Sequence, residues 1–218
     1  MTIQEYFGDW SKMIDLLEAD KIIKKLSASN HIVYPKLKGI FKTFTLYPFD
    51  NLRLLIIGLN PYNTLRPVNC GISTVKIPIA KSLTFVNSPN IQKLSSSLEI
   101  LKESVINYTF PHRTINFDPS LEKWESHGVL LLIPALSLEI GRESSHTLMW
   151  GLFIKSLLTN LSKYHTGTVY ILIGTVAQSF ELYINRQFNH VIHIRHPSWY
   201  ARQKQRMLSD VKRLTPFL

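Results

Sequence analysis

The stretch LRLLIIGL at residues 52–59 is a short apolar run closed by a turn sequence, and it looks like a β-strand. Three similar runs follow it: VLLLI at 129–133, TVYILI at 168–173 and HVIHI at 190–194. Apolarity that continues along a strand, instead of alternating, indicates that both of its faces are covered. The sequence therefore predicts an α/β fold with a central, mainly parallel four-stranded sheet flanked by helices on both faces.

Stretches with helical spacing of apolar residues lie between and before these runs. Residues 91–105 (IQKLSSSLEILKESV) and 148–164 (LMWGLFIKSLLTNLSKY) each carry an apolar stripe and are predicted to be covering helices. Residues 11–25 and 34–43 also have helical character. We therefore expect residues 1–50 to form a helical lead-in.

The organisation expected for the chain is a single domain of 218 residues, 1–218, with the α/β core and its active-site loops at 51–218. A hydrophobic fraction of 45% with 18% charged residues is enough to build a substantial core and argues against disorder. The sequence has no repeat and no low-complexity tract. We expect it to act as a monomer.

Composition also excludes several classes of protein. No apolar stretch approaches the roughly 18–20 residues that a transmembrane helix needs, and the start, MTIQEYFGDW, does not have the pattern of a signal peptide. The single cysteine, Cys70, cannot form an internal disulfide, and no metal-binding spacing is present. The expectation is a cytoplasmic protein of a bacterial or phage context, associated with the nucleoid, without metal, cofactor or membrane contact.

The charge balance favours a polyanionic partner. Twenty-five Lys and Arg residues against 15 Asp and Glu give a formal net charge of +10, which attracts nucleic acid through steering and counterion release. A basic surface can also serve solubility alone. The choice between the two interpretations depends on motifs.

Two turns follow predicted strands directly. GLNPYN at 58–63 comes after the first strand, and RHPSWY at 195–200 comes after the fourth. Parallel strands place their carboxyl ends, and the functional loops attached to them, at one edge of the sheet. Either turn alone is consistent with an ordinary connection. Together, on neighbouring strand tips, they predict a site.

These turns and two further segments resemble the uracil-DNA glycosylase superfamily, specifically the class whose water-activating loop reads GQDPYH and whose second loop reads HPSP. GVLLL at 128–132, with Ser144, Ser145, His146 and Trp150 downstream, is similar to that family's GVLLLN segment and its following Ser-His and Trp. YILIGTVAQ at 170–178 is similar to its penultimate strand. The resemblance spans about residues 50–210.

The resemblance implies a monofunctional DNA glycosylase, which rotates a base out of DNA and hydrolyses its N-glycosidic bond to leave an abasic site. His196 would donate a hydrogen bond to the base oxygen that gains charge. Asn60 would hold the attacking water. The family usually has aspartate at this place, and an asparagine orients a water but does not accept its proton at ordinary pH.

The resemblance also implies a surface that binds DNA. Backbone amides and hydroxyls near the loops would contact phosphates, and either Trp199 or Tyr200 would act as the wedge that fills the gap left by the base. Basic residues after the second turn would attract the backbone, unless they form an ordinary solvated helix face. The residues expected to contact DNA are Pro61, Ser88, Ser145, His146, Arg195, Pro197, Ser198, Trp199, Tyr200, Arg202 and Lys204.

The base pocket departs from uracil recognition. The family's uracil-reading asparagine is replaced by Ile133, and the glutamine of the first loop by Leu59, while Tyr62 is retained. An apolar side chain at the edge of uracil leaves polar groups unpaired. Residues 71–85 look like an expanded loop beside the pocket. The residues expected to line this pocket are Gly58, Leu59, Tyr62, Phe85 and Ile133.

These departures favour a modified base as the target. Glucosylated hydroxymethylcytosine of phage DNA is one possibility, because antiviral glycosylases of this superfamily are known as a class. One alternative is a divergent uracil-DNA glycosylase for base-excision repair. The other is a catalytically inactive DNA-binding or processivity protein of the same fold.

Overall fold

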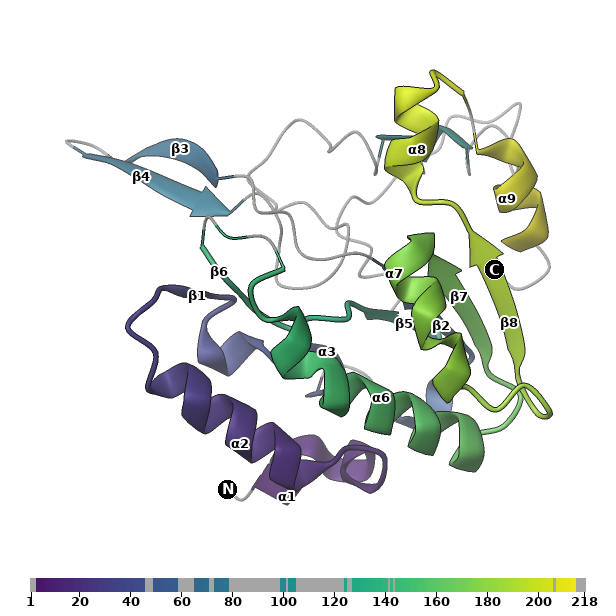
Figure 1. Cartoon of the computed structure of the whole chain (residues 1–218), viewed down its shortest axis with the longest axis horizontal. Coiled ribbons are helices and arrows are strands. Elements are labelled where there is room, and N and C mark those ends of the chain that lie inside the picture. The colour runs from purple at the N-terminus through teal and green to yellow at the C-terminus, as the bar shows by residue number, and fades with distance from the viewer. Residues whose placement is uncertain are drawn as a thin grey trace.

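The computed structural model describes residues 3–45, 49–58, 65–70, 73–78, 99–100, 102–104, 124, 127–140, 142, 144–205 and 207–214. Within these ranges the predicted sheet is present (Figure 1). Its four strands pair in the order β5-β2-β7-β8, and every pairing is parallel. The strands are β2 (Leu54–Ile57), β5 (Val129–Leu132), β7 (Val169–Ile173) and β8 (His190–Ile194). The predicted α/β class and parallel sheet are confirmed.

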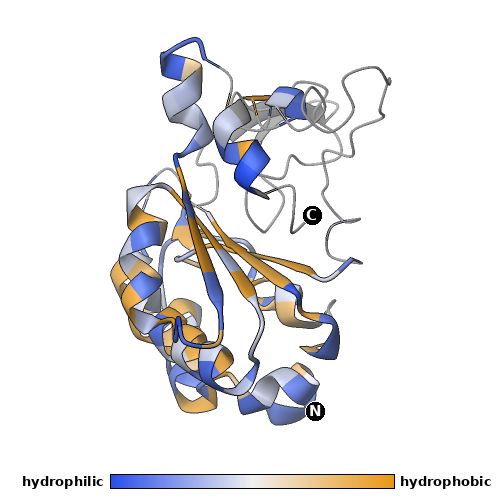
Figure 2. Ribbon diagram, turned by 90° about the vertical axis from the view of Figure 1, so that its right-hand side faces the viewer, coloured by the Kyte–Doolittle hydropathy of each residue, from blue (hydrophilic) through white to orange (hydrophobic). Residues whose placement is uncertain are grey.

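Both faces of the sheet are covered, as the continuous apolar runs indicate. Leu55 and Ile57 of β2 point into one apolar cluster, and Leu54 and Ile56 point into another. All four side chains are at most 5% exposed. Successive residues of a strand face opposite ways, so a run that is apolar throughout supplies two cores. Figure 2 shows the strands as a hydrophobic layer.

The first face is covered mainly by two long helices. Helix α6 (Thr147–Tyr164) matches the helix predicted at 148–164 and buries Trp150 and Phe153 in the first cluster. Helix α2 (Leu16–Ser27) starts later than the predicted 11–25. Its start is fixed by Asp15, whose carboxylate accepts a hydrogen bond from the Glu18 amide at 3.0 Å.

The lead-in contains more than helices. The helix predicted at 34–43 is wrong: Tyr34 belongs to strand β1 (Val33–Tyr34), which pairs antiparallel with β6 (Leu138–Glu139). The residue before a proline is disfavoured in the α conformation, and Pro35 follows Tyr34. The remaining short elements are α1 (Ile3–Phe7), η1 (Gly8–Lys12), η2 (Leu37–Gly39), α3 (Lys42–Thr45) and η3 (Phe49–Asn51).

The second face is covered by the carboxyl-terminal helices. Tyr200 of α8 (Pro197–Arg202) and Val211 of α9 (Leu208–Leu214) pack in the second apolar cluster together with Ile171. Between β7 and β8 lie α7 (Gly174–Gln178) and η4 (Ser179–Tyr183). Of the helix predicted at 91–105, residues 99–100 and 102–104 are helical, and the others lie outside the described residues.

A hairpin occupies part of the segment that was expected to be an expanded loop. Strands β3 (Leu65–Cys70) and β4 (Ser73–Pro78) pair antiparallel, with Cys70 opposite Ser73. Figure 1 shows this hairpin pointing away from the sheet. Residues 79–85 lie outside the described part of the chain.

Candidate active site at the carboxyl edge of the sheet

The carboxyl ends of the four parallel strands bring four chain segments to one edge. Gly58 follows β2, Ile133 follows β5, Gly174 follows β7 and Arg195 follows β8. Gly58 is buried, and its amide donates to the carbonyl of Leu132 at 3.0 Å. The site predicted from the two turns therefore has a common edge on which to form.

His196 lies at the turn between β8 and α8. It is the N-cap of α8, and its Nδ1 accepts a hydrogen bond from the backbone amide of Ser198 at 3.2 Å. The Ser198 hydroxyl lies 2.7 Å from the same nitrogen. Because Nδ1 accepts from an amide, it carries no proton, so the proton of the neutral ring is on Nε2. The imidazole is therefore prepared as a donor through Nε2.

The surroundings keep His196 neutral. Burial, with a smaller contribution from the positive charge of Arg202, lowers the pKa of His196 to about 4. At neutral pH the ring is therefore an uncharged donor. Such a group stabilises charge that develops on a leaving base without first having to lose or gain a proton.

The position of β7 corrects one expectation about the two turns. β2 and β8 are not neighbours, because β7 lies between them. The tip of β7 is Gly174, at φ +79°, and a Cβ placed there would lie 3.2 Å from His196 Cβ. The side chain of His196 therefore packs directly over the tip of β7. The absence of a side chain at Gly174 makes this approach possible.

Gly174→Ala is expected to displace His196. The left-handed backbone costs a side chain about 1–2 kcal/mol, and the added methyl must push against His196 Cβ at 3.2 Å. We expect kcat for base release to fall about 10- to 100-fold, as for a small misplacement of a catalytic group. The matched control is Gly151→Ala on α6, where a Cβ meets nothing within 4 Å. Equal activity of the two variants would contradict this packing role.

The low pKa of His196 also predicts how stability depends on pH. The folded-state pKa is about 4, below the ordinary value of 6.5, so as pH falls below 6.5 the unfolded chain binds a proton before the folded chain does. The free energy of unfolding should therefore decrease from about pH 6.5 to 4, with no contribution above that window. Urea denaturation of the wild type and His196→Ala at several pH values should show a shallower decrease in the variant. Identical slopes would be incompatible with a neutral, buried His196.

Of the first turn, the structure describes only its first residue, Gly58. The expected catalytic Asn60 and the expected pocket and DNA contacts of its loop lie outside the described residues, as do Phe85 and Ser88. Ile133 has no exposed surface and belongs to the apolar cluster on the α6 side. The members of the first turn that stay predictions are Leu59, Asn60, Pro61 and Tyr62.

The predicted DNA contacts around α8 divide into exposed and buried groups. Arg195, Arg202 and Lys204 are exposed. Trp199 is half-buried, and the guanidinium of Arg195 lies 4.3 Å from the centre of its ring. These four side chains form a basic, aromatic surface beside His196, and their contact with DNA stays a prediction.

Three residues expected at the DNA are buried instead. Tyr200 is 5% exposed, and its hydroxyl donates to Asp210 at 2.7 Å, so the prediction of Tyr200 as a wedge is wrong for this structure. Pro197 is buried in the first turn of α8, where a proline lacking an amide proton fits. His146 is 4% exposed, which contradicts its expected phosphate contact.

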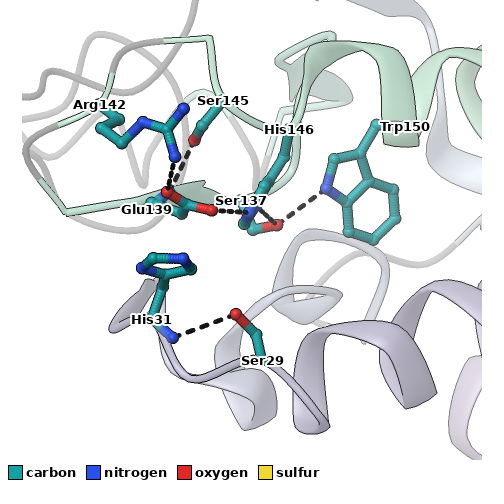
Figure 3. A network of polar contacts seen from close by, with 8 residues as sticks. All are labelled: Ser29, His31, Ser137, Glu139, Arg142, Ser145, His146 and Trp150. Carbon is teal, nitrogen blue, oxygen red and sulfur yellow. Dashed lines mark hydrogen bonds and ion pairs between the residues drawn. The ribbon is translucent and has the colours of Figure 1, made fainter.

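His146 instead belongs to a polar network at the start of α6 (Figure 3). Its Nδ1 lies 2.9 Å from Ser137 Oγ, which also accepts a hydrogen bond from Trp150 Nε1 at 2.8 Å. Ser145, also expected at a phosphate, accepts from the Glu139 amide at 2.8 Å. Burial lowers the pKa of His146. The Ser-His and Trp positions of the resemblance thus hold the segment after β5 against α6.

Sequence reasoning missed several residues that hold the His196 turn. Gly174 was noted only as part of a pattern, although a glycine directly after a buried strand is a usable signal for close approach. Gln178 donates to the Ile194 carbonyl at 3.2 Å, and Asp210 accepts from the Arg195 amide at 3.1 Å. No local pattern in the sequence marks Asp210.

Among the described residues, no group of three or more His, Cys, Asp or Glu side chains could hold a metal ion. None of the described helices is both long and apolar enough to cross a membrane.

Comparisons with known proteins agree with this fold. No protein-family model matches the chain. A curated uracil-DNA glycosylase of Aliarcobacter butzleri is 31% identical over 170 residues, which cover 78% of this chain and 73% of the relative. The crystal structure of mimivirus uracil-DNA glycosylase matches with a TM-score of 0.66 at 19% identity, covering 90% of this chain and 74% of that one. The wild-type UNG structure of Nitratifractor salsuginis matches with a TM-score of 0.62 at 17% identity, covering 99% and 94%.

The strand order and the structural matches define an α/β protein with the fold of these glycosylase structures. The sequence match is more specific. The chain belongs to the uracil-DNA glycosylase family. The predicted superfamily and enzyme class are thereby confirmed.

Proposed function

We propose that this protein excises uracil from DNA by hydrolysing its N-glycosidic bond, leaving an abasic site. The observation that carries this proposal is His196, a neutral imidazole with its proton on Nε2 at the carboxyl edge of the sheet. The identity to a curated uracil-DNA glycosylase supports the same conclusion. The sequence match and the His196 Nε2–H donor, which could stabilise a departing uracil anion, thus support the same activity.

The chemistry follows from what each group can do. The bond between the sugar C1′ and the base nitrogen breaks, and its electron pair leaves with the base. His196 Nε2–H stabilises the resulting charge on the base oxygen by a hydrogen bond. A water adds to C1′ and gives up a proton to solvent. Asn60 would orient this water without taking its proton, which an oxocarbenium-like sugar tolerates.

The surface beside the site supports DNA as the partner. Exposed Arg195, Arg202 and Lys204 offer charge to phosphates, and their contacts would position the strand without reading its sequence. Trp199 is the remaining candidate for the wedge, because Tyr200 is buried. An aromatic ring that replaces an extruded base by stacking contributes about 1–3 kcal/mol.

A second candidate target is a modified base, for example glucosylated hydroxymethylcytosine of phage DNA in anti-phage defence. The replacement of the family's uracil-reading asparagine by Ile133 favours it, because an aliphatic side chain offers no hydrogen bond to the edge of uracil. Uracil is the better-supported target, since the curated relatives are named for it. A third candidate, a DNA-binding protein without activity, would bind duplexes and release no base.

We also propose that one chain is sufficient for activity and needs no metal or cofactor. Gly174, Ser198 and Asp210, which contact His196 or hold its turn, are enough to position this ring without a second copy. A DNA substrate would place the protein at the nucleoid.

A panel of labelled duplexes tests these candidates together. The duplexes carry a single uracil, a mismatched thymine, or glucosylated hydroxymethylcytosine, and alkali after incubation cleaves at abasic sites. The proposal predicts cleavage at uracil. Cleavage at the glucosylated base alone would replace uracil by the second candidate. Binding without cleavage of any duplex would favour the inactive protein.

A further inference from the structure

Asp210 of α9 is a buried carboxylate within a mostly apolar cluster. It is 8% exposed, and Met207 and Val211, three residues before it and one residue after it, have no exposed surface. Burying a charge in such a place is costly unless hydrogen bonds compensate it. Asp210 is therefore expected to do something that an apolar residue at the same position could not.

One oxygen of Asp210 accepts two hydrogen bonds from the two sides of His196. Oδ2 lies 3.1 Å from the backbone nitrogen of Arg195, the residue before His196. The same oxygen lies 2.7 Å from the hydroxyl of Tyr200, four residues after it. The carboxylate thus ties the end of β8 and the body of α8 to a single point.

Arg213 ties the same helix to β8 a second time. Its Nη1 donates to the carbonyl of His193 at 2.9 Å and lies 3.8 Å from Asp210 Oδ1. The guanidinium also offsets part of the carboxylate charge. Helix α9 is therefore fixed to His193 and Arg195, which precede His196 in the chain, whereas Ser198 contacts the ring from the residues that follow it.

The other contacts of the His196 turn do not replace the hydrogen bonds that Asp210 accepts. Ser198 holds the ring through Nδ1, Gln178 holds the Ile194 carbonyl, and Gly174 allows the ring to approach β7. None of these three binds the amide of Arg195. Without Asp210, the part-buried amide of Arg195, the last one before His196, would lose its acceptor.

We propose that Asp210 is a positioning residue that fixes His196 over the tip of β7 by holding Arg195 and Tyr200 at once. The inference rests on the proposed function only for its kinetic readout. Asp210 does not touch the substrate. It acts through the backbone on either side of the imidazole.

The kinetic test compares Asp210→Ala with Asp210→Asn on a uracil-containing duplex. The amide oxygen of asparagine can accept both hydrogen bonds, whereas alanine accepts neither. We expect kcat to fall about 10- to 100-fold in Asp210→Ala with KM nearly unchanged, and to recover to within about threefold in Asp210→Asn. Asp20→Ala, which removes an exposed carboxylate from α2, is the charge control and should behave as the wild type.

A purely structural role predicts a different pattern. Asp210→Ala would then lower the melting temperature while kcat, measured well below that temperature, stayed within twofold of the wild type. That result would overturn the inference. Should Asp210→Ala fail to fold, Tyr200→Phe removes one of the two hydrogen bonds and keeps the ring, and it should lower kcat about two- to fivefold.

Imidazole NMR of labelled protein separates this inference from the proposed function, because it needs no activity. In the wild type the His196 ring should titrate near pH 4. In folded Asp210→Ala the midpoint should rise by at least about one pH unit, since a loosened ring gains water and loses its Ser198 donors. An unchanged midpoint would overturn the inference. A risen midpoint in a protein that releases no uracil would support the positioning role and reject the proposed function alone.

Discussion

His196→Ala is expected to lower kcat for uracil release about 100- to 1,000-fold, with little change in DNA affinity. The basis is the neutral ring, whose proton is on Nε2 because Nδ1 accepts from the Ser198 amide at 3.2 Å. Removing one donor that faces developing negative charge has an effect of this size in other enzymes. Because the hydrogen bond strengthens as the bond to the base breaks, the loss should appear in kcat more than in KM.

Single-turnover cleavage of a duplex with one uracil measures this effect. His190→Ala is the matched control, because it removes an exposed imidazole from the opposite end of the same strand. The control should keep wild-type activity. A rate for His196→Ala within about threefold of the wild type would remove His196 from the proposed chemistry.

Trp150→Ala is expected to destabilise the protein by about 3–5 kcal/mol. Trp150 has no exposed surface and packs edge-on against Phe41 and Phe153, at centroid distances of 5.7 and 5.4 Å. Its indole nitrogen also donates to Ser137 Oγ at 2.8 Å, within the network that holds His146. The alanine variant loses both the packing and this donor. Such a loss is a large part of the stability of an ordinary domain.

Urea denaturation at pH 7 measures the change. Trp150→Phe keeps a ring but removes the donor, so its loss should be smaller, about 1–3 kcal/mol. Leu148→Ala, on the same helix but 96% exposed, should change stability by no more than about 0.5 kcal/mol. A loss below 1 kcal/mol for Trp150→Ala would show that the start of α6 does not depend on this residue.

The sheet could be predicted because the apolar run that indicates each strand lies within that strand. HVIHI at 190–194 became β8 with the same bounds, and VLLLI at 129–133 became β5 with one residue fewer. Continuous apolarity correctly indicated two covered faces. The lead-in was less predictable, because the pairing of Tyr34 with Leu138 depends on a partner about a hundred residues away.

The sequence placed His196 in the turn after the fourth strand, but it did not predict how the residues of that turn pack. The resemblance identified His196 and the following Pro-Ser step, yet it did not distinguish Trp199 from Tyr200. Adjacent residues on a helix point about 100° apart, so when Tyr200 faces the sheet, Trp199 lies toward the surface. Only the position of α9 decides which of the two is buried, since Asp210 takes the Tyr200 hydroxyl. That contact has no signature in the local sequence.

The most direct test of the account is a crystal structure of the protein with a duplex that carries one pseudouridine, whose carbon-carbon bond to the sugar resists hydrolysis. The account predicts that this base is extruded and lies at the carboxyl edge of the sheet, with His196 Nε2 within about 3.2 Å of a base oxygen. A base that stays stacked in the duplex, or that binds away from His196, would contradict it.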